Sequence, residues 1–208
     1  MESPVCRTGT RLIETFGWNG CVFRRLDAHL ARARAAARAL GFDWNARAID
    51  AALARVTGSA PLRVRLTLGR AGDAEVVTAP LPPAAPNWRI AIAPDRLDPD
   101  DPLLRYKTTE RALYDRTRAA LAEGIDETVF VNTRGELAEG TISNLFIAAG
   151  ADLLTPPLAS GCLPGILRAE LLASGRAREA VLRPADLAGA TLHMGNALRG
   201  LIPARIVA

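Results

Sequence analysis

Lysine is nearly absent from this sequence of 208 residues. Lysine and arginine together number 26, and Lys107 is the only lysine among them. Arginine keeps its proton at any ordinary pH, whereas a lysine amine can lose its proton and act as a nucleophile or a base. A primary amine is also the side chain that condenses with an aldehyde. Random sequence drift in an arginine-rich chain could also leave a single lysine. The lysine count alone therefore does not decide between a chemical role for Lys107 and chance.

Other features are missing as well, and each absence narrows the function. No stretch approaches about 18 uninterrupted apolar residues, so we expect no membrane span, and the N-terminus lacks the apolar core of a signal peptide. The three cysteines (Cys6, Cys21 and Cys162) show no C-x-x-C spacing, which favours a reduced, cytoplasmic setting. Aromatic residues are 5% and the net charge is only +4, which argues against a nucleic-acid partner.

A proline-rich stretch divides the sequence into two parts. Residues 79–86 contain four prolines, which disfavour a helix or a central strand. Before it, we expect two short strands in 11–24 joined at the Asn19-Gly20 turn, and helices at 27–41 and about 46–56. An alternating segment from Leu62 onward predicts a strand hairpin. The pattern predicts an α+β fold.

The second part reads as strands with a few helices. Thr109 is expected to cap a helix that runs to about Glu123, which would place Lys107 just before a helix N-terminus, where the dipole lowers the pKa of an amine. A later helix is expected to open near Pro164-Gly165. Its first backbone N–H groups, at Ile166 and Leu167, have the character of an anion site.

Five segments then occur in an order that resembles a known family. They are RLDAHLARA, YKTTERALYD, ETVFVNTRGELAEGTISNLFIA, LLTPPLASGCLPGILRAELL and MGNALRGLIPAR. Their order and spacing resemble the class IV (fold type IV) pyridoxal-phosphate enzymes, which include branched-chain and D-amino-acid aminotransferases and aminodeoxychorismate lyase. The resemblance covers about residues 11–206, and E-G-T-x-S-N-x-F together with L-P-G-x-x-R is far more specific than either motif alone.

The resemblance implies a two-domain fold like that of D-amino-acid aminotransferase. We expect a small N-terminal α+β domain over 1–82, a larger β-rich domain with peripheral helices over 83–208, and pyridoxal 5'-phosphate in the cleft between them. It also implies a homodimer acting on a small amino substrate. The family's usual D-R-G…Y-G-D-G stretch, which normally adds strands and substrate contacts to the small domain, is absent here.

The resemblance assigns chemical roles to three side chains. Lys107 resembles the lysine that forms a Schiff base with the cofactor, and Glu139 the carboxylate that faces the pyridine nitrogen. Arg32 resembles the arginine that binds the phosphate. A carboxylate at the ring nitrogen keeps it protonated, so that the ring accepts electrons from a substrate carbanion, and a forked guanidinium suits a phosphate dianion.

Five further positions complete the expected site. The backbone N–H groups of Ile166 and Leu167 match those that hold the phosphate, and Asn196 and Ala197 match the last loop on the phosphate and substrate side. Arg199, three residues after Asn196, is a candidate partner for a substrate carboxylate, with an ordinary surface arginine as the alternative.

Two features favour a lyase over an aminotransferase. Branched-chain aminotransferases carry a tyrosine five residues after the lysine, where this sequence has Ala112. N-A-L-R-G with its following proline resembles the lyase version of the last loop. Aminodeoxychorismate lyase converts 4-amino-4-deoxychorismate to 4-aminobenzoate and pyruvate on the folate route. The alternatives are a class IV aminotransferase for branched-chain or D-amino acids and a degenerate, non-enzymatic paralogue, against which the joint presence of Lys107 and Glu139 argues.

Overall fold

The computed structural model describes residues 6–81, 83 and 86–207. The chain forms two compact units, of which the first comprises Met1–Pro83 and Tyr106–Glu110 and the second comprises Ala84–Arg105 and Arg111–Ala208. The segment that contains Lys107 therefore belongs to the first unit. Within the proline-rich link, residues 82, 84 and 85 lie outside the described part of the chain, and the expected boundary at 82 falls there.

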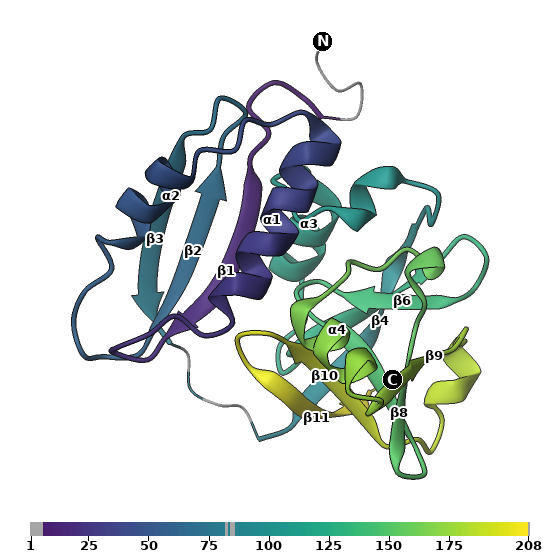
Figure 1. The fold of residues 1–208 in the computed structure, drawn as a ribbon. Coiled ribbons are helices and arrows are strands. Elements are labelled where there is room, and N and C mark those ends of the chain that lie inside the picture. The colour runs from purple at the N-terminus through teal and green to yellow at the C-terminus, as the bar shows by residue number, and fades with distance from the viewer. Residues whose placement is uncertain (1–5, 82, 84–85, 208) are drawn as a thin grey trace. The chain divides into compact units, whose positions relative to one another are not determined.

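The first unit is a three-stranded antiparallel sheet with two helices. Strands β1 (Leu12–Trp18), β2 (Leu62–Leu68) and β3 (Ala74–Pro80) pair in that order. Helices α1 (Leu26–Leu40) and α2 (Ala46–Leu53) lie on one face of this sheet (Figure 1). The predicted α+β character of this unit is therefore confirmed, and α1 ends, as expected, at a glycine, with φ of 70° at position 41.

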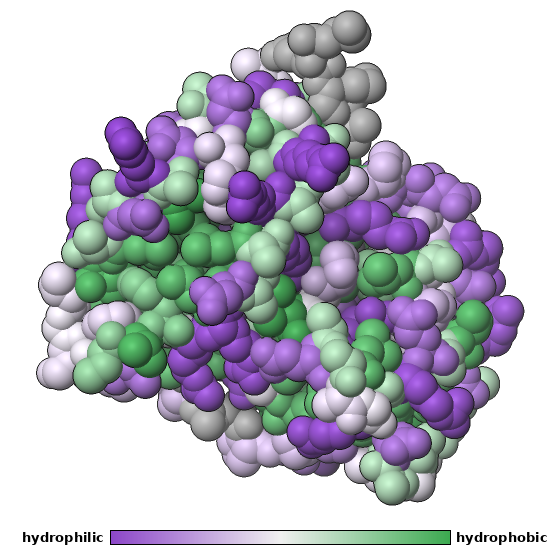
Figure 2. All heavy atoms as spheres, in the orientation of Figure 1, coloured by the Kyte–Doolittle hydropathy of each residue, from purple (hydrophilic) through white to green (hydrophobic). Residues whose placement is uncertain are grey.

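Hydrophobic side chains between the helices and the sheet form the core of the first unit. Phe16 and Leu66 from the strands and Leu40 and Ile49 from the helices are almost completely buried. Trp18 and other hydrophobic side chains at the edge of this core remain half-buried, and Figure 2 shows hydrophobic surface among charged side chains on this unit. Burial of this apolar area supplies most of the unit's folding free energy.

The second unit is built on one large mixed sheet. Its strands are β4 (Trp88–Leu97), β5 (Glu127–Asn132), β6 (Leu137–Gly140), β7 (Asn144–Ala149), β8 (Asp152–Thr155), β9 (Ala177–Glu179), β10 (Leu192–Asn196) and β11 (Gly200–Ile206). They lie in the order β10-β11-β4-β5-β6-β7-β8-β9, and β10 also pairs with β7, so part of the sheet closes on itself. The predicted β-rich second unit is confirmed.

Helical segments accompany this sheet. They are η1 (Pro102–Arg105), α3 (Ala112–Ala119), η2 (Leu158–Ser160), α4 (Ile166–Ala173) and η3 (Pro184–Leu187). None of the helices in the described ranges is both long and apolar enough to cross a membrane. Strand β5 is buried along its whole length, which marks it as a central strand that carries side chains into packing on both faces.

Two predicted elements of the first unit are shorter in the structure. The second strand expected in 11–24 is reduced to a single bridge between Trp18 and Phe23, because Asn19 closes the turn through side-chain hydrogen bonds instead of a continued ladder. The second helix ends at Leu53 instead of about residue 56.

The helix expected to begin at Thr109 begins at Ala112 and ends at Ala119. Thr109 is instead held against β1, since its N–H donates to the Arg11 carbonyl at 2.9 Å and its hydroxyl accepts from the Arg11 N–H at 3.0 Å. Lys107 is therefore five residues in sequence before the start of α3. The predicted start of this helix at Thr109 is therefore wrong.

Candidate active site

Lys107 is held by its backbone along the edge of β1. Its carbonyl accepts a hydrogen bond from the Ile13 N–H at 2.8 Å, and Thr108 forms a bridge with Leu12. The Lys107 side chain is half-buried. An extended segment bonded to a strand gives the lysine a fixed backbone, which a nucleophile requires in order to meet a substrate atom at a defined position.

Arg32, on α1, is held in a fork by a buried carboxylate. Its Nε and Nη2 donate to the two oxygens of Glu14, at 2.9 and 2.6 Å. Glu14 is 2% exposed and also contacts Nδ1 of His29 at 2.5 Å. Burial by itself raises the pKa of Glu14, but the hydrogen bond with His29 and the charge of Arg32 outweigh it and leave that pKa below its ordinary value. Glu14 therefore stays ionised and fixes the plane of the guanidinium.

The same strand thus serves both candidate groups of the first unit. Ile13 holds the backbone of Lys107 and its neighbour Glu14 holds the side chain of Arg32. The backbone of β1 bonds to the lysine segment at the edge of the strand. The Glu14 side chain, which projects from one face of the sheet, bonds to the arginine.

Glu139, on β6, is buried and accepts hydrogen bonds on both oxygens. The Tyr114 hydroxyl donates to Oε1 at 2.8 Å, while the Leu163 N–H at 3.1 Å and Asn144 Nδ2 at 3.4 Å donate to Oε2. The side chain is 6% exposed. These donors come from α3, β7 and the loop before α4, and hydrogen bonds to a carboxylate stabilise its ionised form. Glu139 therefore has the surroundings of a structurally fixed anion.

A second buried carboxylate, Glu127, organises the turn that follows Glu139. Glu127 is completely buried at the start of β5. Its donors are the N–H of Thr128 (3.1 Å), the N–H and hydroxyl of Thr141 (3.0 and 2.5 Å), the N–H of Ile142 (3.1 Å) and the hydroxyl of Ser143 (2.9 Å). The turn between β6 and β7 is therefore wrapped around one side chain, and this explains the physical need for Thr and Ser in the E-G-T-I-S-N segment.

Arg111, the residue before α3, and Arg118 within α3 reinforce this turn. Arg111 donates to the Thr141 carbonyl at 2.9 Å, and Arg118 donates to the Thr141 hydroxyl at 3.1 Å. Arg118 also lies 3.6 Å from Glu127, which compensates part of its buried charge. The helix after the Lys107 segment thus positions the turn beside Glu139.

Ile166 and Leu167 occupy the first turn of α4, as predicted, so their N–H groups lie at a helix start. The residue before them is a glycine with a steric reason to be one: a Cβ on Gly165 would lie 2.0 Å from Oδ1 of Asn144. Asn144 also donates to the Leu163 carbonyl at 3.2 Å. One side chain on β7 thus connects the Glu139 carboxylate with the approach to α4.

Asn196, at the end of β10, shapes the last loop. Its Oδ1 accepts from the N–H groups of Leu198 and Arg199, at 3.1 and 2.9 Å, and its Nδ2 donates to the Ile142 carbonyl at 3.2 Å. This bond ties the last loop to the turn around Glu127. Ala197 is buried, and the Arg199 guanidinium lies over the Trp88 ring at 5.7 Å from its centroid.

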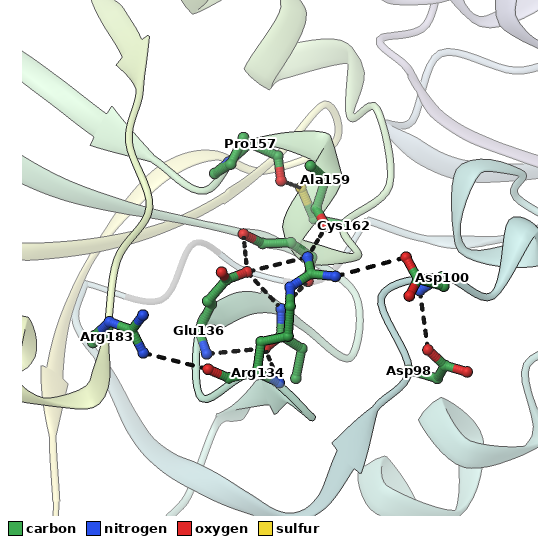
Figure 3. A network of polar contacts seen from close by, with 10 residues as sticks. Asp98, Asp100, Arg134, Glu136, Pro157, Ala159, Cys162 and Arg183 are labelled. Carbon is green, nitrogen blue, oxygen red and sulfur yellow. Dashed lines mark hydrogen bonds and ion pairs between the residues drawn. The ribbon is translucent and has the colours of Figure 1, made fainter.

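The loop before α4 is held by a polar network around Arg134 (Figure 3). Arg134 donates to the Ala159 carbonyl and pairs with Glu136 at 3.3 Å and with Asp100 at 3.6 Å. Burial, followed by the charge of Glu139, raises the pKa of the Cys162 thiol in this loop to about 12. That thiol therefore stays protonated, and a protonated thiol is a poor nucleophile.

The structure places the predicted site residues in two groups. Lys107 and Arg32 belong to the first unit. The others belong to the second, where hydrogen bonds link Glu139 to the approach to α4 and link the last loop to the turn after Glu139. Sequence reasoning missed the supporting side chains, which are Glu14, Tyr114 and Glu127. An acidic residue at the head of a predicted strand, two positions before the apolar run 129–131, was the one signal that could have pointed to Glu127.

Comparison with known proteins gives a consistent family. The model of the class IV aminotransferases matches residues 11–207. A proposed aminodeoxychorismate lyase of Schizosaccharomyces pombe is 31% identical over 178 residues, which is 82% of this chain and 76% of that protein.

Two solved structures extend this comparison. A proposed amino-acid aminotransferase of Mesorhizobium loti is 44% identical with a TM-score of 0.88, and the match covers 95% of this chain and all of that one. The 4-amino-4-deoxychorismate lyase of Pseudomonas aeruginosa is 25% identical with a TM-score of 0.79, over 96% and 83% of the two chains.

Proposed function

Because the chain belongs to the class IV aminotransferase family, we propose that it is a pyridoxal-phosphate-dependent lyase that converts 4-amino-4-deoxychorismate to 4-aminobenzoate and pyruvate. This proposal names one reaction within a family that contains both lyases and aminotransferases. It also assigns each predicted site residue a part in that reaction.

The donor set fits pyridoxal 5'-phosphate in each of its three chemical parts. An aldehyde needs an amine, and Lys107 is the only lysine of the chain. A ring nitrogen needs a fixed anion, and Glu139 is a buried carboxylate with donors on both oxygens. A phosphate dianion needs a guanidinium and backbone N–H groups, which Arg32 and the first turn of α4 provide.

The roles follow from this assignment. Arg32, Ile166 and Leu167 would bind the phosphate, and Glu139 would hold a proton at the ring nitrogen. When bound, the cofactor supplies a ring that accepts electrons from the substrate carbon. Lys107 would take the proton from the amine-bearing carbon of the substrate and return a proton to the departing pyruvate. Arg199 is proposed to bind a substrate carboxylate, and Asn196 and Ala197 to shape the loop that carries it.

The observation that carries the lyase assignment is at the start of α3. The position five residues after Lys107, where branched-chain aminotransferases have a tyrosine, is Ala112 and opens the helix. The phenol that α3 does carry, Tyr114, is bonded to Glu139. A lyase needs only one substrate in the pocket, whereas an aminotransferase must accept two unlike substrates in turn.

A second candidate is an amino-acid aminotransferase. It is favoured by the 44% identity to the Mesorhizobium loti protein, which is described as a proposed enzyme of that kind. That reaction would use the same lysine and carboxylate and would differ in where the second proton is delivered.

One experiment separates the two candidates. The holoenzyme is supplied with 4-amino-4-deoxychorismate alone and, separately, with branched-chain or D-amino acids and 2-oxoglutarate, and Lys107→Ala serves as the inactive control. The lyase predicts 4-aminobenzoate and pyruvate in equal amounts without an amino acceptor. Glutamate formation without 4-aminobenzoate would refute the lyase and favour the aminotransferase.

We also propose that the protein acts as a homodimer, on the strength of the family resemblance. Light scattering of the holoenzyme at micromolar concentration tests this, and a mass of one chain, near 22.1 kDa, would refute it.

A further inference from the structure

Of the three donors described for Glu139, Tyr114 is the one that binds through a hydroxyl group. It donates to Oε1 at 2.8 Å, while Asn144 and Leu163 occupy Oε2. A carboxylate held at both oxygens by donors from three chain segments cannot rotate without breaking a bond. Tyr114 holds Oε1 from α3, so its hydroxyl is one of the restraints on the plane of the carboxylate.

The Tyr114 ring is itself fixed by packing. It meets the completely buried ring of Phe130 edge-on, with centroids 5.1 Å apart, and the Arg111 guanidinium lies 5.5 Å from its centroid. Two ring contacts on a helix of eight residues leave the phenol little rotational freedom. The hydroxyl therefore presents a fixed donor rather than a mobile one.

The phenol also stays protonated. Burial and then the charge of Glu139 raise the pKa of Tyr114 above its ordinary value of 10.0, against a smaller opposing effect of Arg111. Cys162, the other titratable group that faces it within the second unit, raises this pKa further. Tyr114 is thus a donor toward Glu139 at every pH at which the protein would work.

We propose that Tyr114 is a positioning residue that acts through Glu139 to hold the ring nitrogen of pyridoxal phosphate. This inference rests on the proposed function, since it requires Glu139 to face that nitrogen. It gives a role to the phenol that α3 carries at position 114; position 112 of the same helix is an alanine and offers no phenol. A purely structural tyrosine would stabilise the fold, and its removal would change ligand affinity equally with and without the ring nitrogen.

The test compares two ligands on the apoprotein. One is pyridoxal phosphate and the other is its carbocyclic analogue, in which C–H replaces the ring nitrogen and the aldehyde and phosphate are kept. Tyr114→Phe keeps the ring and its packing and removes only the donor, and near-ultraviolet circular dichroism checks that the fold is retained. We expect the affinity for pyridoxal phosphate to fall roughly 2- to 12-fold, the net worth of one hydrogen bond, with no change for the analogue.

Glu139→Gln, alone and combined with Tyr114→Phe, completes the experiment. The single variant should lose roughly 10- to 100-fold in affinity for pyridoxal phosphate but not for the analogue, and the added Tyr114→Phe should then have no further selective effect. Equal losses for both ligands in Tyr114→Phe, or no loss for either, would overturn the positioning role while leaving Glu139 in place. If Glu139→Gln also fails to discriminate, the assignment of Glu139 to the nitrogen fails, and the inference fails with it.

Discussion

Replacing Glu127 by glutamine should destabilise the second unit, although the two side chains have nearly the same shape. Oε1 of Glu127 accepts three hydrogen bonds, from Thr128 and twice from Thr141, and Oε2 accepts two, from Ile142 and Ser143. Every one of these contacts is an acceptor position. An amide must put an NH₂ donor at one of the two oxygens.

The magnitude follows from which oxygen becomes the NH₂ group. An NH₂ at Oε1 would face two backbone N–H groups, and one at Oε2 would face only that of Ile142, because the Ser143 hydroxyl can rotate to accept. The better orientation thus leaves one buried N–H unsatisfied, which costs about 1–3 kcal/mol. The lost charge on the remaining bonds and the weaker partner for Arg118 add about 1–2 kcal/mol. We expect a total of about 2–5 kcal/mol.

Urea unfolding and hydrogen exchange at the Thr141 and Ile142 amides measure this effect. Glu136→Gln is the matched control, because Glu136 also accepts three hydrogen bonds, from the side chains of Asn132, Arg134 and Ser160, but all three end on Oε2. The amide oxygen of glutamine can take the place of Oε2 and still accept from all three donors, so the control should lose about 1 kcal/mol or less. A Glu127→Gln variant as stable as the control, with unchanged exchange at both amides, would refute the reasoning.

Three other substitutions test the site in the same way. Lys107→Ala should abolish covalent attachment of the cofactor, so mass spectrometry after borohydride treatment should find no cofactor on the protein; an adduct elsewhere would contradict the assignment. Glu14→Gln should cost about 3 kcal/mol above pH 4.5. Because the Glu14 pKa is lowered on folding from its ordinary value of 4.5, this stability is present above that pH and is lost as the pH falls through the folded value. The stability difference between the variant and wild type should therefore vary between about pH 3 and 6. A difference that stays constant over this range would contradict the role given to Glu14. Gly165→Ala should push Asn144 from its bond with the Leu163 carbonyl and cost about 1–3 kcal/mol in thermal unfolding, and wild-type stability would show that the side chain yields freely.

The parts of the fold that were predictable from sequence are those with local signals. The glycine at 41 ends α1, the turn before α4 places Ile166 at a helix start, and the strands of the second unit follow their apolar runs. The start of α3 was not predictable in this way. Thr109 has the local features of an N-cap, but it is bonded to Arg11, which lies 98 residues away in sequence. A pairing over that distance overrides a local preference, and no window of neighbouring residues contains it.

The same distinction applies to the candidate site. The groups proposed to contact the ligand, such as Lys107, Glu139 and Arg32, stand in motifs because ligand chemistry restricts their type. The supporting residues have a different requirement: each needs only to place a buried hydrogen-bonding group next to the residue that it holds. Glu14 serves Arg32 from 18 positions away and Tyr114 serves Glu139 from 25, and both distances are set by how a helix packs on a strand. A carboxylate in LIETF or a phenol in ALYD therefore acquires its role only from the fold. Tests on these supporting residues examine the geometry of the site, whereas tests on the motif residues examine its chemistry, and the two sets can fail independently.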